Sequence, residues 1–224
     1  MEPGENARQR GPLVPTLVVV VLRVAVVQHG DKERLPGDPG LTDLGMRQAR
    51  ATARWLAGRD TPVAIWSSPM RRARETTAPI AAELGVPPTT DPRLRERMNW
   101  DDPLAESIDD FLRDWRSATA DRTYVPWSGD SSTEAASRFL AALDDLAMAH
   151  PTGTAIGVSH GGVTTDMLRT LLGDDELGAR APALIDDGVP SCAITTLHGT
   201  NDGWTVASIA ATHHLQDESP HLQP

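Results

Sequence analysis

The sequence contains a single cysteine, Cys192, among its 224 residues, so no disulfide can form within the chain. This excludes the small secreted folds that depend on disulfide crosslinks. Basic residues are also in the minority, since 21 lysines and arginines oppose 31 aspartates and glutamates for a formal net charge of −10. A chain this acidic is not expected to bind nucleic acid or an anionic membrane. An anionic substrate would therefore need a locally basic pocket.

An uninterrupted membrane span is missing as well. The apolar stretch at 13–27, LVPTLVVVVLRVAVV, is broken by Pro15 and Arg23, and the uncharged run is too short to cross a bilayer. A secretory signal peptide is the alternative interpretation, but its cleavage would fall beside His29. We favour a core strand preceded by a flexible N-terminal extension, residues 1–21, and we expect a cytoplasmic protein.

The chain has enough apolar residues, 39%, to bury the core of one α/β domain. Strands are predicted at 23–27, 62–68, 154–162 (which ends in glycines), 192–198 and 204–210. Helices are predicted at 42–58, 69–84, 132–150 and 162–173. The alternation of strands and helices predicts a three-layer α/β/α sandwich with a mostly parallel central sheet. The expected domain spans residues 22–215, followed by a flexible tail at 216–224.

Residues 97–131 interrupt this alternation. They contain Trp100, Trp115 and Trp127, together with eight acidic residues and four arginines. We interpret the segment as a partly helical cap inserted over the sheet. One of its tryptophans, Trp100, is a candidate to face a pocket and stack on an organic group.

Three predicted strands end in chemically suggestive residues: Gln28-His29-Gly30, then Ser67-Ser68-Pro69 with Arg72 soon after, and Ser159-His160-Gly161-Gly162. The carboxyl ends of parallel strands meet at one edge of a sheet, which is where α/β proteins bind ligands. Helix N-termini at that edge add N–H donors and positive dipole ends. The sequence therefore predicts a site for a phosphate-sized anion.

Six ordered segments strengthen that prediction: QHG (28–30), LTDLGMRQA (41–49), SSPMRRARET (67–76), RLRE (93–96), GDSSTEAASRF (129–139) and GVSHGG (157–162). Together they resemble the histidine phosphatase superfamily, with its phosphoglycerate-mutase-like fold, over about residues 22–215. The resemblance implies hydrolysis of a small phosphomonoester through a phosphohistidine, without a metal or a cofactor. The histidines also lack a metal-ligand spacing such as H-x-x-x-H.

The resemblance also implies residue roles. His29 would be the nucleophile, and Arg72 would clamp the phosphoryl oxygens with its planar guanidinium. His160 would donate to the same oxygens, and Glu96 would serve as general acid and then base, with Asp101 and Asp102 as nearby alternatives. Four further positions would belong to the substrate-binding site: Gln28, Gly30, Ser68 and Gly161.

Gln28 departs from the family motif, which has arginine before the histidine. An amide still donates hydrogen bonds but carries no charge. Lys32 and Arg34 follow closely in sequence. Either could fold back and supply the missing positive charge, or both could be solvated loop residues. Both stay candidates for substrate binding.

Three functions remain open from the sequence. The first is a metal-independent phosphatase acting on a small phosphorylated metabolite. The second is a binding module that kept the pocket but lost turnover, and the third is another reaction on a non-phosphorylated substrate. The retained His29, Arg72, Glu96 and His160 favour an enzyme, whereas Gln28 favours the alternatives. The acidic cap argues against a mutase acting on a bisphosphate. Oligomeric state stays open.

Overall fold

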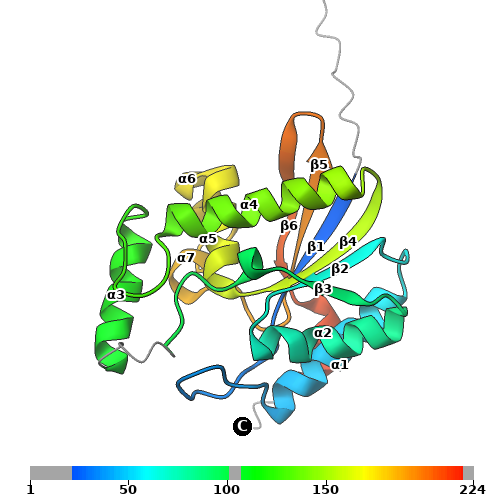
Figure 1. Cartoon of the computed structure of the whole chain (residues 1–224), viewed down its shortest axis with the longest axis horizontal. Helices are drawn as coiled ribbons and strands as arrows, with labels where there is room; N and C mark the ends of the chain where they lie inside the picture. The colour runs from blue at the N-terminus through cyan, green and yellow to red at the C-terminus, as the bar shows by residue number, and fades with distance from the viewer. Residues whose placement is uncertain (1–21, 101–106, 219–224) are drawn as a thin grey trace, which may run out of the picture.

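A six-stranded sheet forms the centre of the computed structural model, which describes residues 22–100 and 107–218 (Figure 1). The strands are β1 (Leu22–Gln28), β2 (Ala64–Ser67), β3 (Pro88–Thr90), β4 (Gly153–Ser159), β5 (Ile194–Thr200) and β6 (Gly203–Ala211). Their order is β3-β2-β4-β1-β5-β6. The first four are mutually parallel, while β5 runs antiparallel to both β1 and β6. The predicted mostly parallel sheet is confirmed.

Helices cover both faces of the sheet. They are α1 (Asp43–Ala57), α2 (Arg71–Leu84), α3 (Ile108–Ala120), α4 (Ser132–Ala149), α5 (Gly161–Leu172), α6 (Asp174–Arg180) and α7 (Leu184–Asp187), with 3₁₀ turns at Pro92–Leu94 and His213–Glu218. In Figure 1, α4 crosses one face of the sheet, whereas α1 and α2 lie below the strands on the other face. This arrangement confirms the predicted three-layer α/β/α sandwich.

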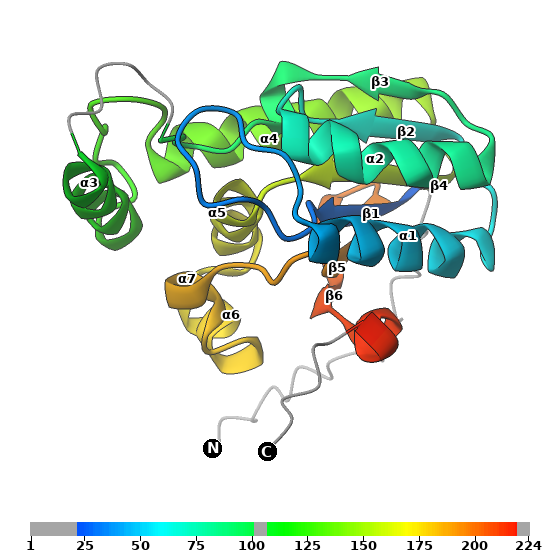
Figure 2. The same ribbon diagram turned by 90° about the horizontal axis from the view of Figure 1, so that it is seen from below.

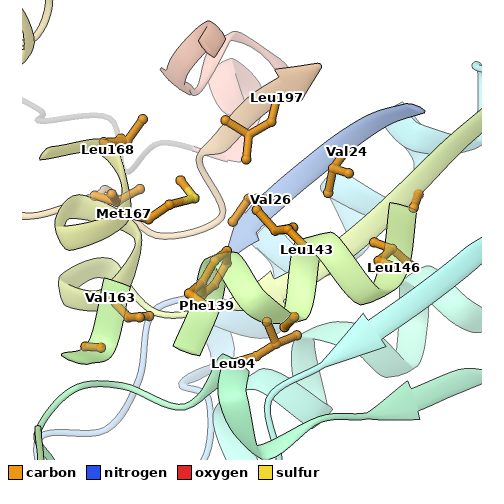
Figure 3. Packing of buried hydrophobic residues seen from close by; sticks show 14 of the residues in the cluster. Val24, Val26, Leu94, Phe139, Leu143, Leu146, Val163, Met167, Leu168 and Leu197 are labelled. Carbon is orange, nitrogen blue, oxygen red and sulfur yellow. The ribbon is translucent and has the colours of Figure 1, made fainter. Parts of the chain in front are cut away.

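Strand β1 is buried on both faces, as its run of apolar residues predicts. Leu22, Val24 and Val26 join Phe139 in the core under α4 and α5 (Figure 3). Ala25 and Val27 face the opposite side and pack with residues of α1 and α2. The strand therefore links the two cores and holds its last residues rigidly at the carboxyl edge.

Local capping explains several element boundaries. The Thr42 side chain accepts from the Gly45 N–H, and Gly58 ends α1, both as predicted. Ser131 and Glu134 form a reciprocal capping box that starts α4. The sequence prediction missed β3, α6 and α7, which are short and have little apolar periodicity.

The predicted cap is partly helical in its described residues, since α3 spans much of it. Figures 1 and 2 both show α3 set apart from the sheet. A buried ion pair joins the segment to α5, with Arg97 Nη1 3.0 Å from Asp166 Oδ1. The Arg97 guanidinium also lies 4.1 Å from the centre of the Trp115 ring on α3.

The predicted ends of the domain are only partly covered. The expected extension at 1–21 lies outside the described residues, and so do residues 219–224 of the expected tail. Residues 216–218, placed in that tail by the sequence, instead complete the 3₁₀ turn His213–Glu218. Within the described chain, no helix combines the length and apolar character needed to span a membrane.

Phe139 is fully buried where α4 meets β1. Replacing it with alanine should lower the free energy of unfolding by about 3–5 kcal/mol, because the ring leaves a cavity that the rigid sheet cannot fill. Urea unfolding measures the loss. Met148→Ala on the same helix is the matched control, since Met148 is 75% exposed. Equal losses at the two positions would contradict this description of the core.

Candidate active site

The backbone of His29 is fixed on both sides at the end of β1. Its N–H donates to the Ser159 carbonyl of β4 at 3.0 Å, and its carbonyl accepts from the Cys192 N–H at 3.1 Å. These bonds continue the ladders to the two neighbouring strands. The histidine is therefore presented from a rigid strand end rather than from a loose loop.

The His29 side chain is held in one tautomer. Nδ1 donates to the Gly30 carbonyl at 2.7 Å, which leaves the Nε2 lone pair as an acceptor. Arg72 Nε lies 3.2 Å from Nε2, and Gln28 Nε2 lies 3.3 Å from it. Burial and the Arg72 charge lower the pKa of His29 to about 3. At neutral pH the ring is uncharged and Nε2 is available as a nucleophile.

Gly30, a predicted substrate-binding residue, holds His29 in place through its backbone. Its N–H donates to Thr76 Oγ1 at 2.9 Å, and its carbonyl already accepts from His29. A Cβ at this position would lie 2.6 Å from the Gly45 carbonyl oxygen at the start of α1. Glycine is needed because the end of β1 and the start of α1 approach so closely.

Arg72 enters the site from the first turn of α2 and is almost fully buried. Its Nη2 donates to Asn99 Oδ1 at 3.3 Å, and Nη1 lies 3.7 Å from Asp38 Oδ1. The neighbouring Arg71 points elsewhere and pairs with Glu75 on the exposed side of the helix. The rotation of about 100° between consecutive residues of the helix thus turns one arginine into the site and its neighbour toward the surface.

His160 and Ser68 lie together beneath His29. The two histidine rings are 5.1 Å apart in an edge-to-face arrangement, and His160 Nε2 lies 2.7 Å from Ser68 Oγ. Ser68 Oγ accepts from the Met70 N–H at 3.3 Å, so its own proton can be donated to His160 Nε2. That pattern leaves Nδ1 of His160 as an N–H donor. Burial, followed by the Arg72 charge, holds the pKa of His160 well below its usual value.

Glu96 lies at the N-terminus of α5. Its carboxylate accepts from the backbone N–H groups of Gly162 and Val163 at 2.9 and 2.7 Å. A Cβ on Gly162 would lie 2.5 Å from the Trp115 ring and 2.6 Å from Glu96 Oε1, which explains the second glycine of the motif. The other acidic candidates, Asp101 and Asp102, lie outside the described residues.

Gly161 is the first residue of α5. An ideal Cβ here would lie 3.5 Å from Gln28 Nε2, so the two motifs touch at this point. The three strand ends therefore converge, as predicted.

A cavity of about 630 Å³ opens above these residues. Its polar lining consists of His29, Lys32, Arg34, Arg72, Glu96 and Asn99. The predicted Trp100 also lines it, whereas Gln28, Ser68 and His160 are buried below the lining. Three of the predicted catalytic residues, His29, Arg72 and Glu96, thus line one cavity, and His160 lies behind them against the His29 ring.

The two candidate cations differ in their surroundings. Lys32 is half-buried, and its backbone pairs with Leu41 in an isolated antiparallel bridge that folds the loop back over the site. Burial and the nearby Arg72 charge lower the pKa of Lys32. Arg34 is exposed at the edge of the cavity. Lys32 is therefore the more enclosed of the two candidate cations.

Sequence interpretation missed two supporting residues. Asn99 donates to the Gly37 carbonyl at 3.2 Å while accepting from Arg72, and so joins the loop to the clamp. Arg138 on α4 donates to the carbonyls of Arg93, Arg95 and Glu96 and holds the segment that carries the acid. Only the proximity of Asn99 to Glu96 in sequence could have drawn attention to it. Among the described residues, no group of three or more potential ligands is arranged to hold a metal ion.

Comparison with known proteins agrees with this geometry. The family pattern of the histidine phosphatase superfamily (branch 1) matches residues 24–212. The chain belongs to the histidine phosphatase superfamily. It is a hydrolase of the phosphatase type.

This histidine phosphatase is similar to a metal-independent phosphoserine phosphatase of Arabidopsis thaliana. The two are 27% identical over 210 residues, which cover 87% of this chain and 84% of the relative. A glucosyl-3-phosphoglycerate phosphatase of Mycolicibacterium vanbaalenii is 32% identical over 170 residues, covering 68% and 75%. The solved complex of a mycobacterial glucosyl-3-phosphoglycerate phosphatase with inorganic phosphate superposes with a TM-score of 0.69 at 26% identity, covering 86% and 98%.

The buried neutral His29 predicts a pH dependence of stability. Its pKa is about 3 in the folded protein and about 6.5 in an unfolded chain, so only the unfolded chain takes up this proton between those values. The free energy of unfolding should therefore fall as the pH drops from 6.5, by up to about 1.4 kcal/mol per pH unit for this one group.

Urea unfolding between about pH 7 and about pH 5 measures this slope. His29→Asn should make it shallower, whereas His213→Asn, at an exposed histidine, should leave it unchanged. An unchanged slope in His29→Asn would mean that the imidazole is not held neutral.

Proposed function

We propose that this histidine phosphatase hydrolyses a small phosphorylated metabolite through a phosphohistidine on His29, without a metal ion. The observation that supports this best is the fixed tautomer of His29, in which Nδ1 donates to Gly30 and Nε2 presents its lone pair beside the cavity. The similar solved structure is a complex with inorganic phosphate, which supports a phosphate-containing ligand for this chain.

In the first step, His29 Nε2 attacks phosphorus, and the bond from phosphorus to the ester oxygen breaks. Arg72 Nε now contacts Nε2 at 3.2 Å and would turn its donors to the phosphoryl oxygens. Gln28 Nε2 lies equally close and adds a neutral donor. His160 Nδ1, freed for donation by the bond from Ser68, would stabilise the charge on the same group.

Glu96 would carry the proton in both steps. It lines the cavity and is positioned by the amides of α5. In its acid form it would protonate the leaving oxygen; as a carboxylate it would then take a proton from the water that attacks phosphorus and breaks the bond to nitrogen. The enzyme ends in its starting state.

The nucleophile is tested by His29→Ala. Hydrolysis of p-nitrophenyl phosphate with a chelator present should fall at least about 10³-fold, because no other group can form the intermediate. Wild-type enzyme quenched during turnover of ³²P-labelled substrate should carry acid-labile, alkali-stable label, the signature of a phosphorylated imidazole. His213→Ala is the matched control at an exposed histidine. Wild-type turnover without ³²P-labelled protein would contradict the mechanism, and so would turnover that survives in His29→Ala. Wild-type protein that binds phosphate but neither turns over substrate nor becomes labelled would indicate a binding module.

Lys32 is proposed to supply the positive charge that Gln28 lacks. Lys32→Ala should lower kcat/KM for p-nitrophenyl phosphate by about 10–100-fold, because a half-buried charge near the phosphate is lost. Arg34→Ala, at the exposed neighbour, should change it by less than about threefold.

Lys32 is the single lysine of the sequence, which allows a direct control. Reductive ¹³C-methylation labels only Lys32 and the terminal amine, and inorganic phosphate should shift the Lys32 methyl resonance. Equal decreases of kcat/KM in Lys32→Ala and Arg34→Ala would contradict the proposal that Lys32, and not Arg34, supplies the positive charge.

A further inference from the structure

The far wall of the active-site cavity is apolar. It is formed by Met98, Trp100, Ile108, Phe111, Leu112 and Trp115. In the described part of the cap, none of the residues that line the cavity is charged. The cations of the cavity, Lys32, Arg34 and Arg72, come from the loop after β1 and from α2. The charged and apolar parts of the cavity are thus supplied by different elements.

Helix α3 turns its apolar face toward this cavity. Ile108, Phe111, Leu112 and Trp115 follow the i, i+3, i+4, i+7 spacing of one helical face. Such a face normally packs into a core, yet Ile108 and Leu112 remain 41% and 38% exposed. Apolar surface of this kind at the mouth of a pocket is typical of a binding site for an apolar group.

The aromatic part of the wall is rigid. Trp115 is held by the Arg97 guanidinium against its ring and by an Arg97 Nη2 bond to its carbonyl. The Phe111 ring lies 6.0 Å from the Trp115 ring. These two rings form a fixed surface on which a flat group can stack.

Among the described residues, few polar groups lie on this wall. The Asn99 side chain is used by Arg72 and by the Gly37 carbonyl. A hydroxyl-rich or carboxylate-bearing leaving group would therefore lose its hydration without gaining partners. Arg72 and Lys32 together match the two charges of a single phosphate. Among the described residues that line the cavity, the exposed Arg34 is the cation that remains for a second anionic group.

We propose that the preferred substrates are phosphate monoesters of bulky apolar or aromatic alcohols that carry no second anionic group. The phosphate lies against His29 and Arg72, and the apolar group lies against Phe111 and Trp115. This inference rests on the proposed phosphatase function. A cavity of about 630 Å³ has room for a phosphate and a two-ring group.

The test compares alkyl phosphates whose leaving alcohols have similar acidity. kcat/KM for 2-(1-naphthyl)ethyl phosphate should exceed the values for glycerol 3-phosphate, O-phosphoserine and 3-phosphoglycerate by at least about tenfold. Equal or higher values for the polar substrates would overturn the proposal.

Variants separate specificity from folding. Phe111→Ser should lower the ratio of kcat/KM for naphthylethyl phosphate over glycerol 3-phosphate by at least about tenfold, mainly through KM. Leu112→Ser, at a partly exposed position of the same wall, should also lower this ratio of kcat/KM values. Trp127→Ala is the control, because Trp127 is a 77% exposed aromatic outside the cavity lining. A ratio that stays constant in both serine variants would contradict a role for this wall.

A phosphonate distinguishes this inference from the proposed function. If the wild type hydrolyses none of the esters, the phosphatase proposal fails, but calorimetry with 2-(1-naphthyl)ethylphosphonate still tests the wall. Binding at least about tenfold tighter than that of ethylphosphonate, and weakened by Phe111→Ser, would support the apolar site. Equal affinities would overturn it.

Discussion

The hydrogen bond from His29 Nδ1 to the Gly30 carbonyl is the interaction on which the rest of the site depends. At 2.7 Å it selects the tautomer that leaves Nε2 free to act. It requires the turn after β1 to bring that carbonyl back beneath the ring, and the turn is possible because Gly30 lets the Gly45 backbone approach. The bonds to Ser159 and Cys192 keep this turn attached to the neighbouring strands. The neutral state and the orientation of the His29 imidazole thus depend on contacts along the whole carboxyl edge of the sheet.

Charge in this protein is distributed unevenly, and the distribution explains the neutral Gln28. The chain carries a net charge of −10, yet its active site holds the buried Arg72 and the half-buried Lys32. A third cation at position 28 would lie close to the buried Arg72 beside His29, and two like charges in a buried site are costly. An amide supplies an N–H donor to His29 Nε2 without adding charge. The site therefore gains a donor where an arginine would add repulsion.

The cap contributes a different kind of surface from the sheet. Its connection to the domain is polar and buried, since Arg97 binds Asp166, Trp115 and Thr119 together. Ser132 also donates to Asp166, which ties the start of α4 to the same point. Because Arg97 holds α3 through Trp115 and Thr119, the apolar face of α3 can stay open toward the cavity. The reaction centre and the surface that meets the leaving group can then vary independently.

The sequence by itself determined the layers, the parallel core and the convergence of His29, Arg72 and His160, because strand and helix periodicity and the carboxyl-edge rule depend only on local pattern. The tertiary structure alone showed that the Gly30 carbonyl accepts from His29 Nδ1 and that Gly30 packs against the backbone of Gly45. It also showed that Lys32 is half-buried whereas Arg34 is exposed. It revealed the supporting roles of Asn99 and Arg138, whose hydrogen-bond partners are distant in sequence. Local periodicity cannot reveal such contacts, because they depend on how far apart loops and helices lie once the core has packed.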